Sequence, residues 1–151
     1  FATAAAVGQT LLTGHYGLRS DQFQIADGSG MSRANRISAS ALVTLLRALA
    51  DSEQKRVLMD SLAICGVDGT LERRLTEVRG RVLGKTGSLS GVATLAGYIL
   101  DSQGRPAVAF ALLFNNVHGG NWRAKAVQDA IVRDWIAQID AQSSSTAPAG
   151  L

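Results

Sequence analysis

The spacing of apolar residues changes between the two halves of the chain. In the first half, four leucines between positions 42 and 49 recur at intervals of three or four residues, which predicts a helix with one buried face. Ser38 or Ser40 is placed to cap this helix, because a serine hydroxyl accepts a hydrogen bond from a free N–H at a helix start. The other elements expected here are a helix over residues 1–13, a short strand over 23–26 and a helix over 52–62.

The second half has a pattern that is typical of strands. Residues 81–83, 93–100 and 107–114 are apolar, and Gly or Pro residues separate them. This pattern predicts a three-stranded antiparallel meander. Two of the strands are nearly continuous apolar runs, so we expect both faces of the sheet to be covered. The apolar region 92–114 is interrupted by Asp101-Ser-Gln-Gly-Arg-Pro106, which argues against a membrane-spanning helix.

A last helix is expected to follow the strands, with Asn121 as its cap. Its apolar residues fall on one side and should pack on the sheet. Residues 141–151 are rich in Ser, Ala, Pro and Gly, so we expect a disordered tail there. We therefore predict that residues 1–140 form one domain or part of a larger one, of α/β class (α+β type), with an antiparallel sheet and flanking helices. The apolar positions of the last helix are Trp122, Ala126, Val127, Ala130, Ile131, Trp135 and Ile139.

Composition limits the classes of function. The 151 residues are 46% apolar and 18% charged, as in an ordinary globular domain. The net charge of +3 comes from scattered basic residues with no interleaved aromatics, which argues against nucleic-acid binding. The single cysteine, Cys65, excludes an internal disulfide and a cysteine zinc cluster, and we expect it to be buried. The chain starts at Phe1 without a signal peptide, so we expect a processed product or an excised fragment.

The stretch VLGKTGSL, residues 82–89, is the main candidate for chemistry. A phosphate-binding loop needs Gly, four residues and then Gly-Lys-Ser/Thr, but position 79 is Arg79 and Gly80 comes one place late. Such a loop also opens a helix, whereas the residues after Gly87 are strand-like. Lys-Thr-Gly is instead one of three signatures of penicillin-binding and β-lactamase-type serine enzymes.

In enzymes with that signature, the triplet lies on an edge strand beside the nucleophile. An edge strand has free backbone N–H and C=O groups, so an extended peptide can pair with it. A lysine there offers positive charge to a substrate carboxylate, and glycine permits close backbone approach. The tetrapeptide Lys85–Ser88 alone would equally fit a strand that enters a glycine turn, so the wider sequence has to decide.

Three blocks of sequence supply that decision: IADGSGMSRANRISASALVTLL (Ile25–Leu46), GVDGTLERRL (Gly66–Leu75) and GKTGSLSGVATLAGYI (Gly84–Ile99). In this order they resemble the D-alanyl-D-alanine carboxypeptidase/endopeptidase family, the class C low-molecular-mass penicillin-binding proteins. The resemblance implies the C-terminal part of a penicillin-binding or serine β-lactamase-like transpeptidase fold. It also implies an envelope hydrolase that cleaves D-Ala-D-Ala ends, and often cross-links, of peptidoglycan without a metal or organic cofactor.

By the same resemblance, Lys85 and Thr86 match residues that contact the terminal carboxylate of the substrate and tune proton transfer. Gly87 keeps the strand approachable. Ser88 matches the residue whose backbone N–H contributes to the oxyanion hole, where charge develops in the transition state. The Ser88 hydroxyl is a further candidate contact of the carboxylate.

Asp27 and Ser29 belong to an Asp-Gly-Ser-Gly block that also matches the family. Two interpretations stay open for it. The glycines permit a tight turn, in which Asp and Ser side chains bond the local backbone. Alternatively, Asp27 and Ser29 line the substrate cleft.

The nucleophile motif Ser-x-x-Lys has one formal match, Ser52–Lys55. Ser52 lies at an expected helix start, where capping explains it. In the family that the chain resembles, the nucleophile lies upstream of the block that begins at Ile25. The Ser-x-Asn motif does not occur. We therefore expect the nucleophile to lie outside this chain, and we interpret His15 and His118 as structural or solvated residues.

The favoured function is a segment of a serine D-Ala-D-Ala peptidase that is inactive alone. The alternatives are a non-catalytic peptidoglycan-binding or scaffold fragment and, less in keeping with the Asp-Gly-Ser-Gly block, a serine β-lactamase. The expected partners are peptidoglycan D-Ala-D-Ala peptides, β-lactams and the missing N-terminal portion of the same polypeptide. An exposed sheet would also permit a homo-oligomer. The expected location is the bacterial cell envelope, periplasmic or otherwise extracytoplasmic.

Overall fold

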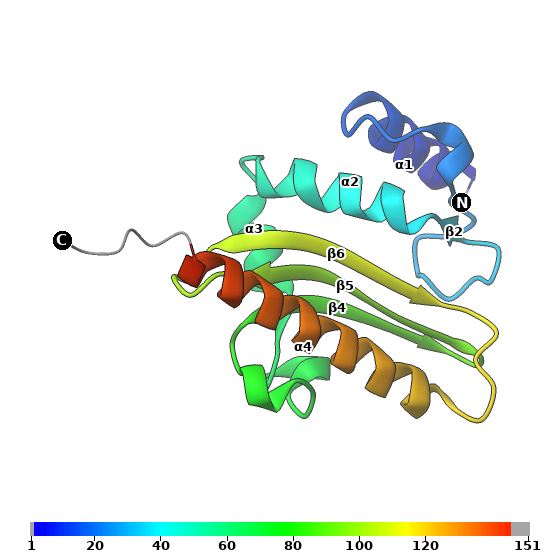
Figure 1. Ribbon diagram of the computed structural model, residues 1–151. Helices are drawn as coiled ribbons and strands as arrows, with labels where there is room; N and C mark the ends of the chain where they lie inside the picture. Colours follow the sequence, from blue (N-terminus) through cyan, green and yellow to red (C-terminus); the bar gives the residue numbers. More distant parts are fainter. Residues whose placement is uncertain (1, 146–151) are drawn as a thin grey trace. The chain divides into compact units, whose positions relative to one another are not determined.

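The computed structural model describes residues 2–145. The chain forms two compact units, Phe1–Leu58 and Met59–Leu151. The first unit is mainly helical, and the second contains a four-stranded antiparallel sheet with one long helix (Figure 1).

Helices make up most of the first unit. The sequence predicts Ser38 or Ser40 as the cap of the second helix, and the structure selects Ser38, whose hydroxyl accepts a hydrogen bond from the Ala41 N–H at 3.1 Å. The third helix begins at Lys55 rather than Ser52, because residues 51–54 form a turn. The elements are α1 (Ala2–Gly14), η1 (Ser20–Gln22), β1 (Phe23–Gln24), β2 (Arg36–Ile37), α2 (Ala39–Ala50) and α3 (Lys55–Ser61), the last of which runs into the second unit.

β1 and β2 form a two-stranded antiparallel ladder in which Phe23 pairs with Ile37. The strand expected at 23–26 is confirmed over its first two residues. Its partner β2 is missed by the sequence, because two residues carry no alternating pattern. The small core of this unit contains Leu18, Phe23 and Ala41, with Leu12, Tyr16, Ile25 and Leu45 packed against it.

The sheet of the second unit has the strand order β3-β4-β5-β6, and each neighbouring pair is antiparallel. The predicted meander is confirmed, and a short fourth strand adds to one side. β4 does not end at Leu83 but continues to Leu89, because every residue from Val82 to Leu89 has a partner on β5. The elements are β3 (Ala63–Ile64), η2 (Gly69–Leu71), η3 (Thr76–Val78), β4 (Val82–Leu89), β5 (Val92–Leu100) and β6 (Pro106–Phe114).

β4 and β5 approach each other closely at Gly97. A Cβ atom at this position would overlap the carbonyl oxygen of Leu83 and lie 2.8 Å from the Cα of Gly84, so a larger residue does not fit. β5 is buried along most of its length, whereas β6 is largely half-buried. Covered faces were predicted for both strands; this holds for β5 and is wrong for β6, because β6 is the last strand of the sheet.

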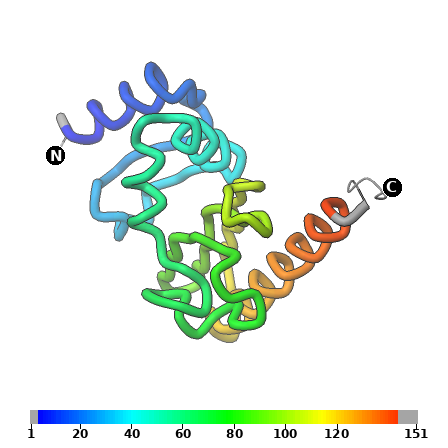
Figure 2. Tube along the Cα trace, turned by 90° about the vertical axis from the view of Figure 1, so that its left-hand side faces the viewer, coloured from blue at the N-terminus to red at the C-terminus, as the bar shows by residue number. Residues whose placement is uncertain are grey.

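Helix α4 (Asn121–Ser145) packs along one face of this sheet as a single unbroken helix (Figure 1, Figure 2). Cys65 belongs to the same core and is fully buried, as predicted, with its thiol donating to the Val78 carbonyl at 3.2 Å. The buried core consists of Cys65, Leu71, Leu75, Val82, Leu95, Ile99, Phe110, Val132 and Ile136, with Trp135 and Ile139 among the residues packed against it.

The apolar stripe predicted for the last helix is wrong in its first half. Trp122 is 65% exposed and Val127 is 50% exposed. The buried positions include Ala124 and Gln128, and a polar/apolar pattern assigns Gln128 to the surface. Burial is tolerated because both ends of the amide are paired: Nε2 donates to the Ala93 carbonyl at 3.0 Å, and Oε1 accepts from Arg74 at 3.1 Å.

The end of α4 also departs from the sequence prediction. The helix continues to Ser145, so residues 141–145 are helical rather than part of a tail. Residues 146–151 lie outside the described residues. Region 92–114 forms β5 and β6 with a turn between them, as predicted. Within residues 2–145, no helix has the length and apolar character needed to cross a membrane.

Candidate active-site strand

One edge of β4 is open where it carries the Lys-Thr-Gly triplet. β5 pairs with β4 along its whole length, but β3 pairs only with Leu83 and Gly84. From Lys85 to Leu89, no other strand of the described residues pairs with the second edge. The predicted edge strand is therefore confirmed from Lys85 onward.

The main-chain bonds on either side of Val82 show which residues face that edge. The Arg81 carbonyl accepts from the Leu100 N–H at 2.9 Å, on the β5 side, and the Val82 carbonyl accepts from the Cys65 N–H at 3.0 Å, on the β3 side. Main-chain groups of successive strand residues point alternately to the two edges. Thr86 and Ser88 therefore direct their N–H and C=O groups to the open edge.

The Lys85 side chain is exposed and turns back to this edge. Its Nζ donates to the Thr86 carbonyl oxygen at 2.6 Å. This carbonyl is one of the groups that a paired peptide would use. The lysine charge and the main-chain groups of the open edge are thus held at the same place on the strand.

Thr86 contacts a second segment of the chain. Its Oγ1 lies 2.9 Å from Oγ1 of Thr70, which belongs to η2. A larger residue does not fit at position 87, because a Cβ on Gly87 would overlap Oγ1 of Thr94, its partner on β5. The triplet is therefore shaped on one side by β5 and contacted on the other by the GVDGT segment.

The main chain and the side chain of Ser88 point to different parts of the structure. Its N–H faces the open edge, whereas its Oγ accepts a hydrogen bond from Nδ2 of Asn121 at 3.0 Å. The same Nδ2 donates to the carbonyls of Leu89 and Val92, each at 2.8 Å. The sequence predicts that Asn121 caps α4, but its amide instead ties the start of the helix to the turn between β4 and β5.

A cavity of about 620 Å³ lies at this end of β4, formed by residues 88–91 and 117–121. His118 is one of its lining residues and is exposed. The lining contains no carboxylate that would orient the imidazole. This agrees with the interpretation of His118 as a residue outside a Ser–His–Asp arrangement.

The Asp27 carboxylate organises the loop of the Asp-Gly-Ser-Gly block in the first unit. Oδ1 accepts from Asn35 Nδ2 at 2.8 Å and from the Gly30 N–H at 3.0 Å. Oδ2 accepts from Ser29 Oγ at 3.1 Å and from the Ser32 N–H at 3.0 Å. The hydrogen bond from Asn35 is the main cause that holds the pKa of Asp27 below its ordinary value. These contacts give Asp27 and Ser29 a structural role in the loop, and their place at a cleft stays a prediction.

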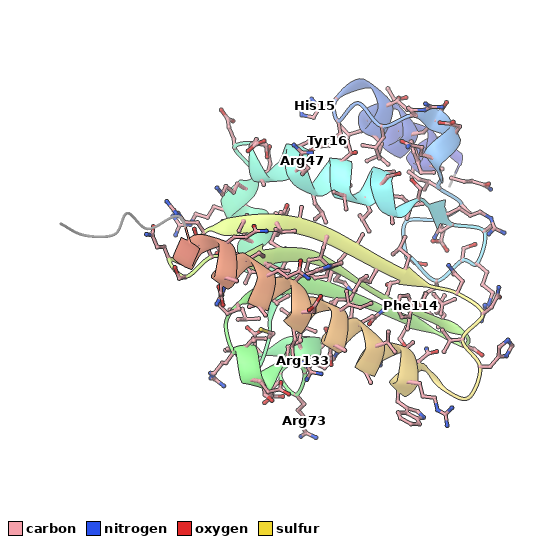
Figure 3. The ribbon with its side chains drawn as sticks, viewed as in Figure 1. His15, Tyr16, Arg47, Arg73, Phe114 and Arg133 are labelled. Atoms are coloured by element: carbon pink, nitrogen blue, oxygen red, sulfur yellow. The ribbon has the colours of Figure 1, made fainter. Side chains whose placement is uncertain are left out.

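Ser52 lies in the turn between α2 and α3. Its hydroxyl donates to the Leu49 carbonyl at 2.9 Å and accepts from the Gln54 N–H at 3.2 Å. Leu49 belongs to α2 and Gln54 to the turn, so both partners are local main-chain groups. The predicted helix cap is wrong, because α3 begins only at Lys55. His15, at the end of α1, packs edge-to-face on Tyr16 with ring centroids 4.7 Å apart (Figure 3).

Two contacts of the strand were not predicted from the sequence. One joins Thr70 to Thr86, and the other joins Asn121 to Ser88. Thr70 lies within GVDGTLERRL, one of the three blocks that carry the family resemblance, and that position was the available signal. Asn121 had a signal only as a helix cap. Neither partner follows from spacing, because 16 residues separate Thr70 from Thr86 and 33 separate Asn121 from Ser88.

An antiparallel sheet with a helix across one face and an open-edged Lys-Thr-Gly strand is the arrangement of the penicillin-binding class of serine enzymes. Comparison with known proteins makes this assignment specific. The chain belongs to the D-Ala-D-Ala carboxypeptidase 3 (S13) family, whose model matches residues 1–138.

Individual relatives support this family assignment. Over 121 residues the chain is 35% identical to D-alanyl-D-alanine carboxypeptidase DacB of Haemophilus influenzae, which covers 78% of this chain and 25% of that protein. Over 112 residues it is 39% identical to a D-alanyl-D-alanine carboxypeptidase of an Actinomadura species, covering 70% of this chain and 20% of that one. The chain thus spans a quarter or less of the length of these relatives.

A solved structure supports the fold. Penicillin binding protein 4 from Haemophilus influenzae, complexed with a novel β-lactam, superposes with a TM-score of 0.77 at 31% sequence identity. The match covers 90% of this chain and 33% of that one. The predicted family and fold class are confirmed.

Proposed function

We propose that this chain is the C-terminal part of a serine-type D-Ala-D-Ala carboxypeptidase/endopeptidase and supplies its substrate-binding strand. The observation that carries the proposal is the open edge of β4 from Lys85 onward, in a chain of this family. On this proposal, the Ser-x-x-Lys and Ser-x-Asn motifs belong to a part of the enzyme outside residues 1–151. The substrates are D-Ala-D-Ala ends of peptidoglycan peptides.

The substrate peptide pairs with the open edge in an extended conformation. Main-chain groups of Thr86 and Ser88 face that edge and supply the pairing. Lys85 and the Thr86 hydroxyl then hold the terminal carboxylate, since hydrogen bonds from a charged donor to a carboxylate are among the strong ones. Lys85 already lies beside the edge and has to exchange the Thr86 carbonyl for the carboxylate when the peptide binds.

Chemistry begins when the serine outside this chain attacks the carbonyl carbon of the penultimate D-Ala. The terminal D-Ala leaves as a free amine, an acyl-enzyme ester forms, and water hydrolyses that ester. Negative charge develops on the carbonyl oxygen during the attack, and the Ser88 N–H is proposed to donate to it. Losing one such donor costs roughly 10²–10³ in rate. A β-lactam acylates the same serine through its strained amide.

The substrate places the enzyme in the bacterial cell envelope, at an extracytoplasmic site where peptidoglycan is exposed. The partners of this chain are then peptidoglycan peptides, β-lactams and the nucleophile-bearing portion of the same polypeptide. The half-buried strand β6 is the surface proposed for a homo-oligomer.

Replacing Lys85 by alanine in the complete enzyme tests the proposal. We expect acylation by a penicillin to slow by about 10- to 100-fold, because a hydrogen bond to a charged group is lost. The thermal midpoint should change little, since Lys85 is exposed. The matched control is Lys55→Ala, which changes another exposed lysine and at the same time tests the Ser52–Lys55 motif. Equal acylation rates for Lys85→Ala and wild type, or parallel losses of stability and activity, would contradict the proposed role.

A further inference from the structure

The pair of threonine hydroxyls at the open edge raises a question of proton direction. In the structure Oγ1 of Thr86 donates to Oγ1 of Thr70 at 2.9 Å, a normal distance for a hydrogen bond between hydroxyls. Each hydroxyl has one proton, and one of the two protons lies between the oxygens. A Thr86 that donates to Thr70 has no proton left for a ligand, whereas a Thr86 that accepts from Thr70 is free to donate elsewhere.

A carboxylate at the open edge would reverse this direction, because an ionised carboxylate only accepts hydrogen bonds. Thr86 must point its proton at the carboxylate, and Thr70 must then donate to Thr86. A neutral amide end also has N–H donors, so it can be bound with either direction. With a carboxylate bound, the hydrogen bonds from Thr70 to Thr86 and from Thr86 to the carboxylate point the same way. Each of the two then strengthens the other.

Thr70 is held firmly enough to act in this way. The residue after it, Leu71, is fully buried in the core of the second unit. The residue before it, Gly69, has a φ of 53° and little room for a side chain, since a Cβ would lie 3.1 Å from that of Ala63. Upstream, Asp68 accepts from the Ile64 N–H at 2.6 Å. The short helix η2 thus fixes the backbone at Thr70.

The same segment is anchored to α4 from its other end. Arg74 donates to the Asp129 carboxylate, with a shortest contact of 2.7 Å, and to Oε1 of Gln128 at 3.1 Å. Both side chains of the ion pair are largely buried. The loop that carries Thr70 is therefore clamped between the sheet and the helix.

We propose that Thr70 is a positioning residue that makes the proposed substrate site selective for a terminal carboxylate, by donating its proton to the Thr86 hydroxyl. This inference rests on the proposed function of the Lys85–Ser88 strand. It goes beyond it in naming a residue outside the Lys-Thr-Gly motif and the chemical feature of the substrate that this residue reads.

The experiment uses the complete enzyme with two substrates, an acyl-D-Ala-D-Ala peptide and the same peptide with a C-terminal amide. Thr70→Val removes the hydroxyl at nearly constant volume and should lower kcat/KM for the carboxylate peptide about tenfold, the effect of losing one hydrogen bond in a charged network. For the amide peptide the expected change is within about twofold, since that end group does not depend on one proton direction. Thr70→Ser restores the hydroxyl and should restore the selectivity.

Thr86→Val and the double variant Thr70→Val/Thr86→Val complete the test. The double variant should lose no more selectivity than Thr86→Val alone, because Thr70 acts only through Thr86. If Thr70→Val does not fold, Thr70→Ala removes the same hydroxyl and takes its place.

The outcomes separate this inference from the proposed function. Loss of carboxylate selectivity in Thr86→Val but not in Thr70→Val overturns the role of Thr70 alone. Unchanged selectivity in Thr86→Val overturns both, because the strand then does not read the carboxylate through Thr86. An equal fall for both peptides in Thr70→Val, accompanied by a lower thermal midpoint, shows a structural residue and also overturns the inference.

Discussion

Two adjacent arginines show how strongly the role of a single residue depends on its position. The Arg73 side chain extends away from the fold into solvent (Figure 3). The Arg74 side chain turns inward and bonds Asp129, Gln128 and the Lys125 carbonyl. The sequence presents them as one basic pair. Only Arg74 has a place in the fold, so a basic pair in this chain says nothing by itself about an anionic partner.

A change of the Asp27 loop tests its structural role at this scale. The pKa of Asp27 lies below its ordinary value of 3.8, first because Asn35 donates to the carboxylate. A carboxyl whose pKa is lowered by folding adds stability above its unfolded pKa, and that contribution is lost as the pH falls from about 3.8 through the lower folded value. We expect Asn35→Ala to raise the pKa of Asp27 toward 3.8, measured by NMR titration of the side-chain carboxyl carbon.

The control for that titration is in the same unit. Asp21 has a pKa that is lowered mainly by a hydrogen bond from Arg19, and Asn35 does not contribute to it. Asn35→Ala should therefore leave the Asp21 titration unchanged. An Asp27 pKa that stays at its wild-type value would show that the carboxylate is not organised by Asn35.

At the scale of elements, α4 is joined to the rest of the second unit at both ends. Asn121 ties its start to the β4–β5 turn, and Arg81 pairs with Asp140 at 2.7 Å near its other end. Between these, Arg74 pairs with Asp129 in the middle of the helix. Because β4 is the proposed substrate strand, the helix that holds its turn also sets the position of Ser88.

Of these three links, the ion pair between Arg74 and Asp129 should contribute most to the free energy of unfolding. Arg74→Met should leave the Asp129 carboxylate and Oε1 of Gln128 without their donor in a largely buried place, which costs roughly 2–4 kcal/mol of unfolding free energy. The measurement is urea unfolding. The control is Arg133→Met, whose partner Glu77 is at 2.8 Å but largely exposed, and which should lower the unfolding free energy much less than Arg74→Met does. Equal losses in the two variants would contradict a buried network.

The elements that the sequence predicts well are those with a long, regular pattern. The leucine spacing of α2 and the apolar runs of β5 and β6 are confirmed within a few residues. The two-residue strands β2 and β3 are missed because they are too short to have a pattern. The face of α4 is misplaced because Gln128 is buried by specific hydrogen bonds from distant residues, which no periodicity contains.

At the scale of the whole molecule, the same distinction holds for the site. The Lys-Thr-Gly strand and its open edge are predictable through the enzyme class that has this signature, because the motif is contiguous and can be recognised in the sequence. The apolar pattern alone ends this strand at residue 83. Its contacts from Thr70 and Asn121 are not predictable, because they depend on how distant segments pack. The proposed reaction also needs a serine nucleophile outside this chain, so the isolated chain is a test of the proposal.

We expect the isolated 151-residue chain to form no covalent adduct with a penicillin. Acylation needs a nucleophile within hydrogen-bond reach of its base. The hydroxyl of the formal candidate, Ser52, donates to the Leu49 carbonyl and accepts from the Gln54 N–H, which are local main-chain groups. Lys85, Thr86 and the Ser88 N–H remain available for weak, reversible binding of a carboxylate. Intact-mass spectrometry after incubation with a penicillin should show an unmodified chain, whereas the complete enzyme under the same conditions should gain one penicilloyl group. A penicilloyl group mapped to Ser52 in the isolated chain would instead make Ser52–Lys55 the nucleophile motif, and Ser52→Ala would then abolish the adduct.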